Sequence, residues 1–549
     1  MQTSVEGSPA KLSGADRWRA DVVSGFLVFL IALPLCLAIS LASGYPAIAG
    51  VFTAIIGGLL SPWISNSELT IKGPAAGLIV IAVGCVMEFG HGEVTSEGYR
   101  LALGVGVAAG VIQIVLALVR SGVVSELFPS AAVHGMLAAI GVIIMAKQFP
   151  IAIGVTPHAK EPLHLIAEIP SLLPQANPEI AFIGLVNLAL LFAWPALPFK
   201  ALRKIPAQMV VLLLAIPMGY LFDLDHTHTY TFASHNYELS DKFLVNVPAS
   251  ILGAVTFPDF SGVWTATGAK WILLYVLIGS LESLLSAKAI DLLDPQRRKT
   301  DFNRDLLAVG VGNTLAASIG GLPMISEIVR SKANIDNGAQ TRFANMFHGL
   351  FLLVFVALLP QLIHRIPLAA LAAMLVYTGF RLAHPREFVH MYHVGWDQLV
   401  VFCGTLLGVV GIDLLVGVII GIILTCVLHV LRGVSFGSFF HPGLEIDEPD
   451  DYSTRVRVQN AAVFSTWLSL RKALMAIDRE RTILLDLSAA SLVDSSTLEK
   501  LHELQSDFFH EGRTLIVIGL RGHTPISHHP LATRKKPADE TNVSTAAPV

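Results

Sequence analysis

Long apolar runs recur along most of this chain, and they constrain its fold more than any other feature. Residues 22–41, 101–119 and 399–430 are almost unbroken apolar sequence. A helix needs about 20 such residues to cross the hydrocarbon core of a bilayer. Only 14% of the 549 residues are charged, whereas soluble proteins carry roughly 25%. The sequence therefore predicts a polytopic α-helical membrane protein.

The apolar runs divide into about fourteen expected membrane segments. Seven precede residue 222 and seven follow residue 270, and an odd number per half predicts a 7+7 inverted repeat. The segments are residues 22–42, 46–63, 74–88, 101–120, 131–148, 178–198, 205–222, 270–287, 305–319, 324–333, 344–362, 367–380, 398–412 and 414–432.

Loop charges predict the orientation of the segments. Alternate loops are rich in Lys and Arg, as in Lys299 with Arg304 and Lys332 with Arg342. The opposite loop of residues 222–269 has one basic residue, Lys242. Basic loops stay on the cytoplasmic side, so we expect both chain termini to be cytoplasmic.

The composition changes after residue 433. Short strand and helix patterns alternate over residues 451–522, as in a small α/β domain. We expect a cytoplasmic N-terminal segment at 1–20, a transporter domain at 21–433 and a polar linker at 434–450. The polar tail at 523–549 is expected to be disordered.

No enzyme signature is present, and the four cysteines fall inside apolar runs, as small core residues do. His226 and His228 lie near two aspartates in an outer loop. We interpret this cluster as a polar loop, and a metal site is the weaker alternative. The chain is predicted to need no metal, no other cofactor and no nucleic acid.

The third and tenth segments are short and follow Gly and Pro, reading TIKGPAAGLIVIAVG (70–84) and GGLPMISEIVR (320–330). Such segments at matching places in two halves point to a transporter's binding site. We expect half-helices to begin near Gly73–Pro74 and Pro323, with N-termini that favour an anion. The small residues that allow close backbone approach are Gly73, Ala75, Ala76 and Gly77.

Two carboxylates stand inside these apolar segments. Glu282 lies in the eighth, with Ser286 one helical turn later, and Glu327 lies about three residues into the tenth half-helix. Acidic residues at membrane depth mark ion or substrate paths by default. Glu327 either neutralises Arg330 or faces Glu282. In the second case the two carboxylates would carry a proton or, with Ser286, hold a sodium ion.

Five stretches resemble the SulP (solute carrier 26) family of anion transporters. The resemblance covers roughly residues 15–522, and the last stretch resembles a STAS domain. The stretches are ALPLCLAISLASGYP (32–46), IKGPAAG (71–77), GSLESLLSAKAIDLL (279–293), GVGNTLAASIGGLP (310–323) and LLDLSAASLVDSSTLEKL (484–501).

This resemblance implies a uracil-transporter-like fold of fourteen segments. A core of segments 1–4 and 8–11 would move in an elevator-like manner against a gate of segments 5–7 and 12–14. The anion would lie between the third and tenth half-helices. Family members are typically dimers, and their substrates include sulfate, bicarbonate, chloride and dicarboxylates.

The family motif also implies roles for single residues. Glu282 and Ser286 match an Asp and a Thr that help bind sodium in sodium–bicarbonate members. Where those members have small residues and Thr in the tenth segment, this chain has Ser326, Glu327 and Ile328. This departure favours a two-carboxylate, proton-sensitive site. Arg330 matches a family arginine, and Leu35 makes the first-segment side of the site apolar. The expected substrate-binding residues are Gly73, Pro74, Ala75, Ala76, Ser326, Ile328 and Arg330.

In the STAS-like stretch, Ser496 aligns with a serine that is phosphorylated in some anti-sigma antagonists. The resemblance therefore offers Ser496 as a regulatory position. The alternative is that this serine belongs to the N-terminal cap of a helix.

We therefore expect a secondary anion transporter, not an enzyme, in the inner membrane of a bacterium. Sulfate or another inorganic oxyanion is the first substrate, bicarbonate the second and a dicarboxylate the third. Coupling is to H⁺ or Na⁺, with H⁺ favoured by Glu282 and Glu327. Expected partners are membrane lipid, a second copy of the chain and a cytoplasmic regulator of the STAS domain. The alternatives are a nucleobase-type carrier and a non-transporting scaffold.

Overall fold

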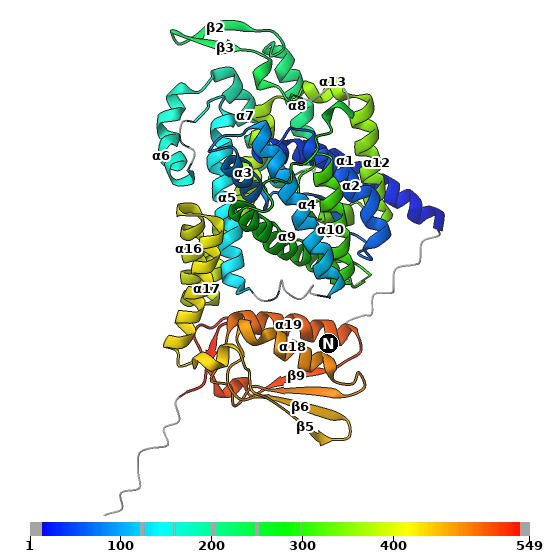
Figure 1. Cartoon of the computed structure of the whole chain (residues 1–549), viewed down its shortest axis with the longest axis vertical. Coiled ribbons are helices and arrows are strands. Elements are labelled where there is room, and N and C mark those ends of the chain that lie inside the picture. The colour runs from blue at the N-terminus through cyan, green and yellow to red at the C-terminus, as the bar shows by residue number, and fades with distance from the viewer. Residues whose placement is uncertain are drawn as a thin grey trace, which may run out of the picture. The chain divides into compact units, whose positions relative to one another are not determined.

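The computed structural model describes residues 14–537, except 121–125, 127, 158, 160, 199–204, 247–251 and 297. Contacts divide the chain into two compact units (Figure 1). The first contains Met1–Ser125 and Gly141–Arg381, and the second contains Glu126–Ile140 and Leu382–Val549. Most of the expected N-terminal segment and the last part of the tail lie outside the described residues.

Helices dominate the first unit. Each of the seven apolar ranges expected before residue 222, and each of the five expected between residues 270 and 380, contains a helix. The helices are α1 (Gly14–Ala42), α2 (Ala49–Ile64), α3 (Ile79–Phe89), α4 (Ser96–Leu118), α5 (Ser130–Ala152), α6 (Pro162–Leu172), α7 (Pro178–Ala193), α8 (Ala207–Leu221), α9 (Ala266–Leu293), α10 (Phe302–Ser318), α11 (Ile328–Asp336), α12 (Phe343–Leu358), α13 (Pro360–His364) and α14 (Leu368–Leu382). Of these, α5 begins in the second unit and continues into the first.

Six helices in the described part of the chain are long and apolar enough to cross a membrane unaided. The others are shorter, which is typical of transporters with broken helices. The six are Gly14–Ala42, Ser96–Leu118, Ser130–Ala152, Pro178–Ala196, Ala266–Asp291 and Leu414–Leu431.

Polar side chains start several of these helices. The hydroxyls of Thr95 and Thr265 accept the backbone N–H groups of Gly98 and Gly268, at 3.0 Å each. The carboxylate of Asp301 accepts two N–H groups at the start of α10. These caps satisfy donors that a helix leaves unpaired in its first turn.

A short antiparallel strand pair joins the two halves of the first unit. Strand β1 (Ile71–Pro74) pairs with β4 (Met324–Glu327), and Lys72 lies opposite Ser326. The expectation that helices begin at Pro74 and Pro323 is therefore wrong: α3 begins at Ile79 and α11 at Ile328. The pairing of β1 with β4 holds residues 71–74 and 324–327 in extended backbone, so neither helix begins at its proline.

A hairpin projects from one end of the first unit (Figure 1). It consists of β2 (His228–Phe232) and β3 (His235–Leu239). His226 contacts Asp223 at 2.7 Å, and no group of three metal-ligating side chains occurs among the described residues.

The second unit combines helices with a small α/β domain. A four-stranded sheet has the order β5-β6-β7-β9, in which β5 and β6 are antiparallel and the other neighbours are parallel. The helices are α15 (Pro385–Val394), α16 (Trp396–Gly411), α17 (Leu414–Leu431), α18 (Trp467–Ala476) and α19 (Ser495–His510), and the strands are β5 (Leu444–Asp450), β6 (Ser453–Val458), β7 (Thr482–Asp486), β8 (Leu492–Val493), β9 (Leu515–Ile518), β10 (Thr524–Pro525) and β11 (Arg534–Lys535).

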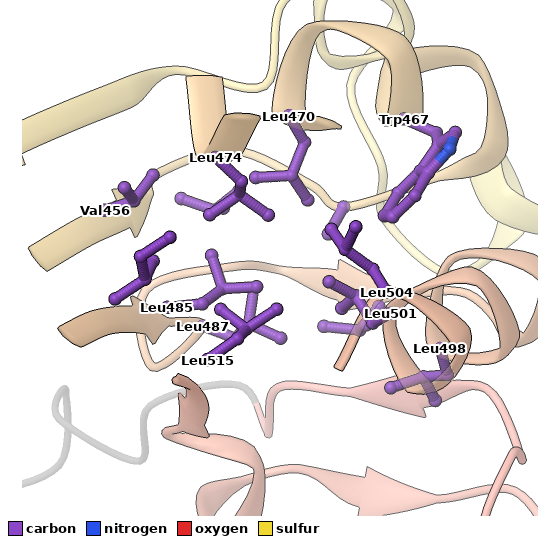
Figure 2. Packing of buried hydrophobic residues seen from close by; sticks show 14 of the residues in the cluster. Val456, Trp467, Leu470, Leu474, Leu485, Leu487, Leu498, Leu501, Leu504 and Leu515 are labelled. Atoms are coloured by element: carbon purple, nitrogen blue, oxygen red, sulfur yellow. The ribbon is translucent and has the colours of Figure 1, made fainter. Parts of the chain in front are cut away.

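An apolar core holds the α/β domain together. Leu470 and Leu474 of α18 and Leu501 of α19 pack against Val456 and Leu485 of the sheet (Figure 2). These side chains are almost fully buried and belong to a larger apolar cluster whose burial stabilises the domain.

Two boundary predictions for this region are wrong. The expected linker 434–450 contains β5, an acidic edge strand that pairs with β6, with an irregularity between Asp447 and Asp450. The expected disordered tail contains β10 and β11, which extend a sheet with β8. Ala532 and Thr533 are buried there. Local polarity hid these three strands, because pairing with β6 in the case of β5, and with β8 in the case of β11, holds them in the structure.

Candidate functional site

The β1–β4 pair has two faces, and functional side chains lie on both. Side chains alternate across a strand, so Glu327 projects from one face and Ser326 from the other. The guanidinium of Arg330 belongs to the Glu327 face, where it packs against Gly73. The ammonium of Lys72 belongs to the Ser326 face.

Arg330 is fully buried in the first turn of α11. Its Nη1 atom donates to Cys36 Sγ at 3.5 Å. A Cβ at position 73 would collide with Nη1, so Gly73 leaves the space that the guanidinium fills. The Nε and Nη2 atoms of Arg330 have no hydrogen-bond partner among the described residues.

Glu282 and Glu327 are the two carboxylates expected at this site, and the interpretation that they face each other stays a prediction. Glu282 accepts the backbone N–H of Gly77, and its carboxylate fills the space of the missing Gly77 side chain. Within the described part of the chain, Glu282 Oε2 and Glu327 Oε1 are buried without a partner. Glu327 also acts on Arg330, but neither group is saturated by the other.

The sequence suggested that Glu327 lies inside the half-helix, but the structure places it just before the first residue of that helix. It is the N-cap residue of α11 with extended backbone, at φ −90° and ψ 115°. Its side chain makes no capping hydrogen bond. This position places the carboxylate at the junction of strand and helix, where the first-turn N–H groups begin.

Lys72 and Asp305 form a buried ion pair that the sequence reasoning missed. Lys72 Nζ lies 2.5 Å from Asp305 Oδ1, and the two residues are 1% and 0% exposed. Lys72 also donates to Ser326 Oγ, which in turn donates to Asp305 Oδ2 at 3.0 Å. Ser65 Oγ donates to Asp305 Oδ1 at 2.7 Å. A Lys and an Asp at the edges of apolar segments were the available sequence signal.

Side chains from neighbouring helices satisfy the backbone of the two broken segments. Asn313 accepts the N–H of Met324 at 2.6 Å and donates to its carbonyl at 3.3 Å. Ser283 accepts the N–H of Ser326 at 3.0 Å, and Ser331 accepts the N–H of Ile71 at 2.8 Å. Non-helical backbone at membrane depth needs such partners.

The expected substrate residues differ in how accessible they are. Ile328 is 44% exposed, and Ala76 and Glu327 are half-buried. Gly73, Pro74 and Ala75 are buried. Ser326 is 0% exposed and fully engaged with Lys72, Ser283 and Asp305, so its hydroxyl is not free for a ligand. Ser286 is buried.

Ser496 lies in the first turn of α19 and is buried. Its Oγ accepts the backbone N–H of Ser130, the first residue of α5, at 2.9 Å. The capping role at this helix belongs to Asp494, which accepts the N–H of Thr497 at 2.7 Å. Nearby, Glu126 accepts the indole N–H of Trp467. Ser496 thus contacts a membrane helix within the second unit.

Chemically, the Glu327 face offers a buried cation, two carboxylates and the N-terminus of a half-helix. Such a face can hold a small anion and can also take up a proton or a cation. No residue of this set is arranged as a nucleophile with a base, the pairing that covalent catalysis needs.

Comparisons with known proteins point to one group. The sequence profile of the Sulfate permease family matches residues 18–405. The putative sulfate transporter YvdB of Bacillus subtilis (strain 168) is 24% identical over 513 residues, which cover 92% of each chain. The bicarbonate transporter BicA of Picosynechococcus sp. is 24% identical over 415 residues, which cover 75% of this chain and 70% of that protein.

Solved structures share the fold. The transmembrane domain of a cyanobacterium bicarbonate transporter BicA superposes with a TM-score of 0.62 at 21% identity, covering 74% of this chain and 97% of that one. Murine Solute Carrier 26 family member A9 in the inward-facing state gives 0.67 at 16% identity, covering 93% and 86%. The chain therefore has the helical membrane fold of these transporters.

Proposed function

Because the chain belongs to the sulfate permease family, we propose that it is a secondary active transporter of a small anion and not an enzyme. Sulfate or another inorganic oxyanion is the first candidate, bicarbonate the second and a dicarboxylate the third. The relatives named as sulfate and bicarbonate transporters support this order. The two carboxylates would suit a nucleobase carrier as well, so uracil belongs in the test.

One observation carries the proposal. The guanidinium of Arg330 is buried in the space next to Gly73 where a side chain would lie, and two of its nitrogens are unpaired among the described residues. Its positive charge adds to that of the α11 N-terminus. The anion would lie at Ala76, Glu327 and Ile328, against backbone of the Gly73–Pro74–Ala75 turn. Ser326 would not touch the anion and would affect the site indirectly, through its hydrogen bond with Lys72.

The charges around β1 and β4 support coupling to protons. On the Glu327 side, Glu282 and Glu327 provide two carboxylates and Arg330 provides one cation, whereas Lys72 and Asp305 pair with each other on the opposite side. Fully ionised, this cluster carries one negative charge and would repel an anion. Binding of one proton to the Glu282–Glu327 pair removes that charge. A sodium ion held by Glu282 and Ser286 would do the same, so Na⁺ is the second candidate.

The finer architecture belongs to the same proposal. Fourteen spans form a 7+7 inverted repeat, in which the core carries the anion past the gate in an elevator-like movement. The α/β domain is of the STAS type and cytoplasmic, as is the N-terminus. The protein works as a homodimer in a bacterial inner membrane.

Ser496 would regulate transport through its bond to Ser130. A phosphate on this buried hydroxyl would break the contact between α19 and the start of α5. A cytoplasmic partner that binds the α/β domain would act on the same contact.

Uptake by purified protein in proteoliposomes tests the function. Radiolabelled sulfate, bicarbonate, fumarate and uracil are offered, each with an imposed H⁺ gradient, an imposed Na⁺ gradient or neither. We expect saturable uptake of sulfate or another of the anions, accelerated by the H⁺ gradient. Uptake of uracil alone, or of none of the four, would contradict the proposal. Stimulation by Na⁺ alone would still agree with anion transport, but the coupling ion would then be Na⁺, bound by Glu282 and Ser286.

A further inference from the structure

A cavity of about 550 Å³ in the first unit shares no lining residue with the candidate anion site. Its wall consists of Tyr220, in the last turn of α8, together with residues 357–362 and Arg365. This stretch includes the break between α12 and α13 at Leu359. The β2–β3 hairpin projects from the same end of the unit (Figure 1). Anion transport gives no reason for a cavity at this place.

Three leucines form the apolar part of the cavity. Leu358, Leu359 and Leu362 are all exposed in the protein alone, with Leu358 at 72%. Leu358 is the last residue of the apolar helix α12, and Tyr220 is the penultimate residue of the apolar helix α8. Exposed apolar side chains on membrane helices face acyl chains, and tyrosine is enriched where the chains meet the headgroups. The cavity therefore lies at the depth of a phospholipid's glycerol and phosphate.

Arg365 places a cation in the cavity wall. Its Nη1 atom pairs with the carboxylate of Asp225, and its guanidinium lies over the ring of Tyr220, 4.9 Å from the centroid. A guanidinium has five N–H donors in a planar fork, so one carboxylate engages only some of them. The side chain is 35% exposed. Its remaining donors suit a phosphate group, which arginine binds through paired hydrogen bonds.

Negative charge lies beside this cation. The carboxylate of Asp225 is 25% exposed and balances the charge of Arg365. Ala357 and Leu358, the last two residues of α12, line the cavity, and the C-terminal end of a helix favours a cation. The site thus offers places for an anion and for a cation at once. A zwitterionic headgroup matches both, whereas an anionic headgroup matches only Arg365.

The wall that carries Arg365 is held in place on two sides. His364 Nδ1 lies 2.7 Å from Val245 O, and the N–H of Val245 donates to Ile366 O at 3.0 Å. A Cβ at Gly219 of α8 would lie 3.3 Å from Pro367 Cγ. These contacts fix the backbone before and after the arginine, so little ordering is needed when a ligand binds.

We propose that this cavity binds a phospholipid of the phosphatidylethanolamine type. The phosphate accepts hydrogen bonds from the remaining donors of Arg365, and the primary ammonium donates to Asp225. One acyl chain lies against the three leucines. Phosphatidylcholine carries the same phosphate but an ammonium without N–H groups, and phosphatidylglycerol carries no cation. The inference goes beyond the proposed function and holds whichever solute the protein transports.

Native mass spectrometry of the purified full chain in detergent tests the proposal. Phosphatidylethanolamine, phosphatidylcholine and phosphatidylglycerol with the same acyl chains are titrated separately, and each gives a dissociation constant for the first lipid bound. We expect the constant for phosphatidylethanolamine to be at least about tenfold lower than the other two, since one charge-assisted hydrogen bond contributes about that factor. Glycerophosphoethanolamine, the same headgroup without chains, should not displace the lipid at equal concentration, which separates a lipid from a free phosphate ester.

Two substitutions should change the lipid preference in different ways. Arg365→Gln should weaken binding of phosphatidylethanolamine to the level of phosphatidylcholine. Asp225→Asn leaves the cation unbalanced, so the preference should change to phosphatidylglycerol, a reversal that a merely structural role would not produce. Lys242→Gln, at an exposed cation outside the cavity, is the matched control and should keep the wild-type order. If Arg365→Gln protein does not fold, Arg365→Lys replaces it and should bind phosphatidylethanolamine at least about threefold more weakly, because the planar fork is lost.

Several results would overturn the inference. These are equal dissociation constants of wild type for the three lipids, a wild-type order in the Arg365 and Asp225 variants, and displacement by glycerophosphoethanolamine. Loss of dimers in Arg365→Gln protein with an unchanged lipid order would assign the cavity to a contact with a second copy, and the proposal would fail. None of these outcomes depends on transport, so the proposed function is tested separately by uptake.

Discussion

The guanidinium of Arg330 occupies the space that a side chain at Gly73 would need. The two residues are more than 250 positions apart, yet the pairing of β1 with β4 brings them together. Glycine is required here for this close approach, since β1 itself has ordinary extended backbone. The contact ties the third and tenth segments into one site.

Gly73→Ala should therefore displace Arg330. We expect the KM for the transported anion to rise at least tenfold, because the positive charge moves away from the half-helix N-termini. Gly279→Ala in α9 is the control, since its new Cβ would meet only ordinary contacts at 3.5 and 3.6 Å. Equal KM values for the two variants would show that the contact does not matter for binding.

Glu327→Gln removes the carboxylate at the strand–helix junction and keeps its shape. Uptake against a concentration gradient should fall at least tenfold, because the pair that we propose to carry the proton loses one of its two carboxylates. Exchange of internal for external anion needs no net proton movement and should stay within threefold of wild type. Glu238→Gln, at an exposed residue of the hairpin, is the control. If concentrative uptake by the Glu327→Gln protein equals that of wild type, Glu327 has a structural role and no role in coupling.

Breaking the Lys72–Asp305 pair should destabilise the protein strongly. Lys72→Met or Asp305→Asn leaves one buried charge without its partner, a change that costs about 3–5 kcal/mol. The double variant Lys72→Met/Asp305→Leu should be more stable than either single variant, since no charge stays buried. Lys332→Met, which breaks an exposed pair with Asp336, should cost only about 0–1 kcal/mol. Melting temperatures in detergent measure these differences, and additive losses would contradict the account.

Glu387 makes the stability of the second unit depend on pH. It lies in α15, outside the expected membrane segments, and a hydrogen bond from His134 lowers the pKa of its carboxyl group. A lowered pKa stabilises the folded protein above the ordinary value of about 4.3, and this contribution is lost as the pH falls through the folded pKa. The melting-temperature gap between wild type and Glu387→Gln should thus shrink from pH 7 to about pH 3.5. Glu161→Gln, at a far more exposed Glu–His pair, should show no such trend, and a constant gap for Glu387→Gln would refute the prediction.

Much of the fold follows from the sequence alone. Apolar length predicts the helices, and Gly and Pro predict that the third and tenth segments are broken. The positions at which α3 and α11 begin could not be read in this way. They depend on the pairing of β1 with β4 across the chain, and local patterns carry no information about such a partner. The strand β5 was missed for a different reason: its acidic sequence is typical of a linker, although it pairs with the neighbouring strand β6.

The site was predicted unevenly. Glu282, Glu327 and Arg330 stood out because charge is rare in apolar segments. Lys72 and Asp305 carry the same signal but lie at segment edges, where the charge could be solvated. Ser326 was expected at the ligand, yet it serves the Lys72–Asp305 pair.

Anion binding to purified protein tests the central claim most directly. Equilibrium binding of radiolabelled sulfate, or of whichever anion the uptake panel selects, is measured for wild type, Arg330→Gln and the exposed-site control His164→Leu. We predict saturable binding by wild type and the control, and a dissociation constant at least tenfold higher for Arg330→Gln. Equal dissociation constants for wild type and Arg330→Gln would contradict a site built on Arg330 and the β1–β4 junction.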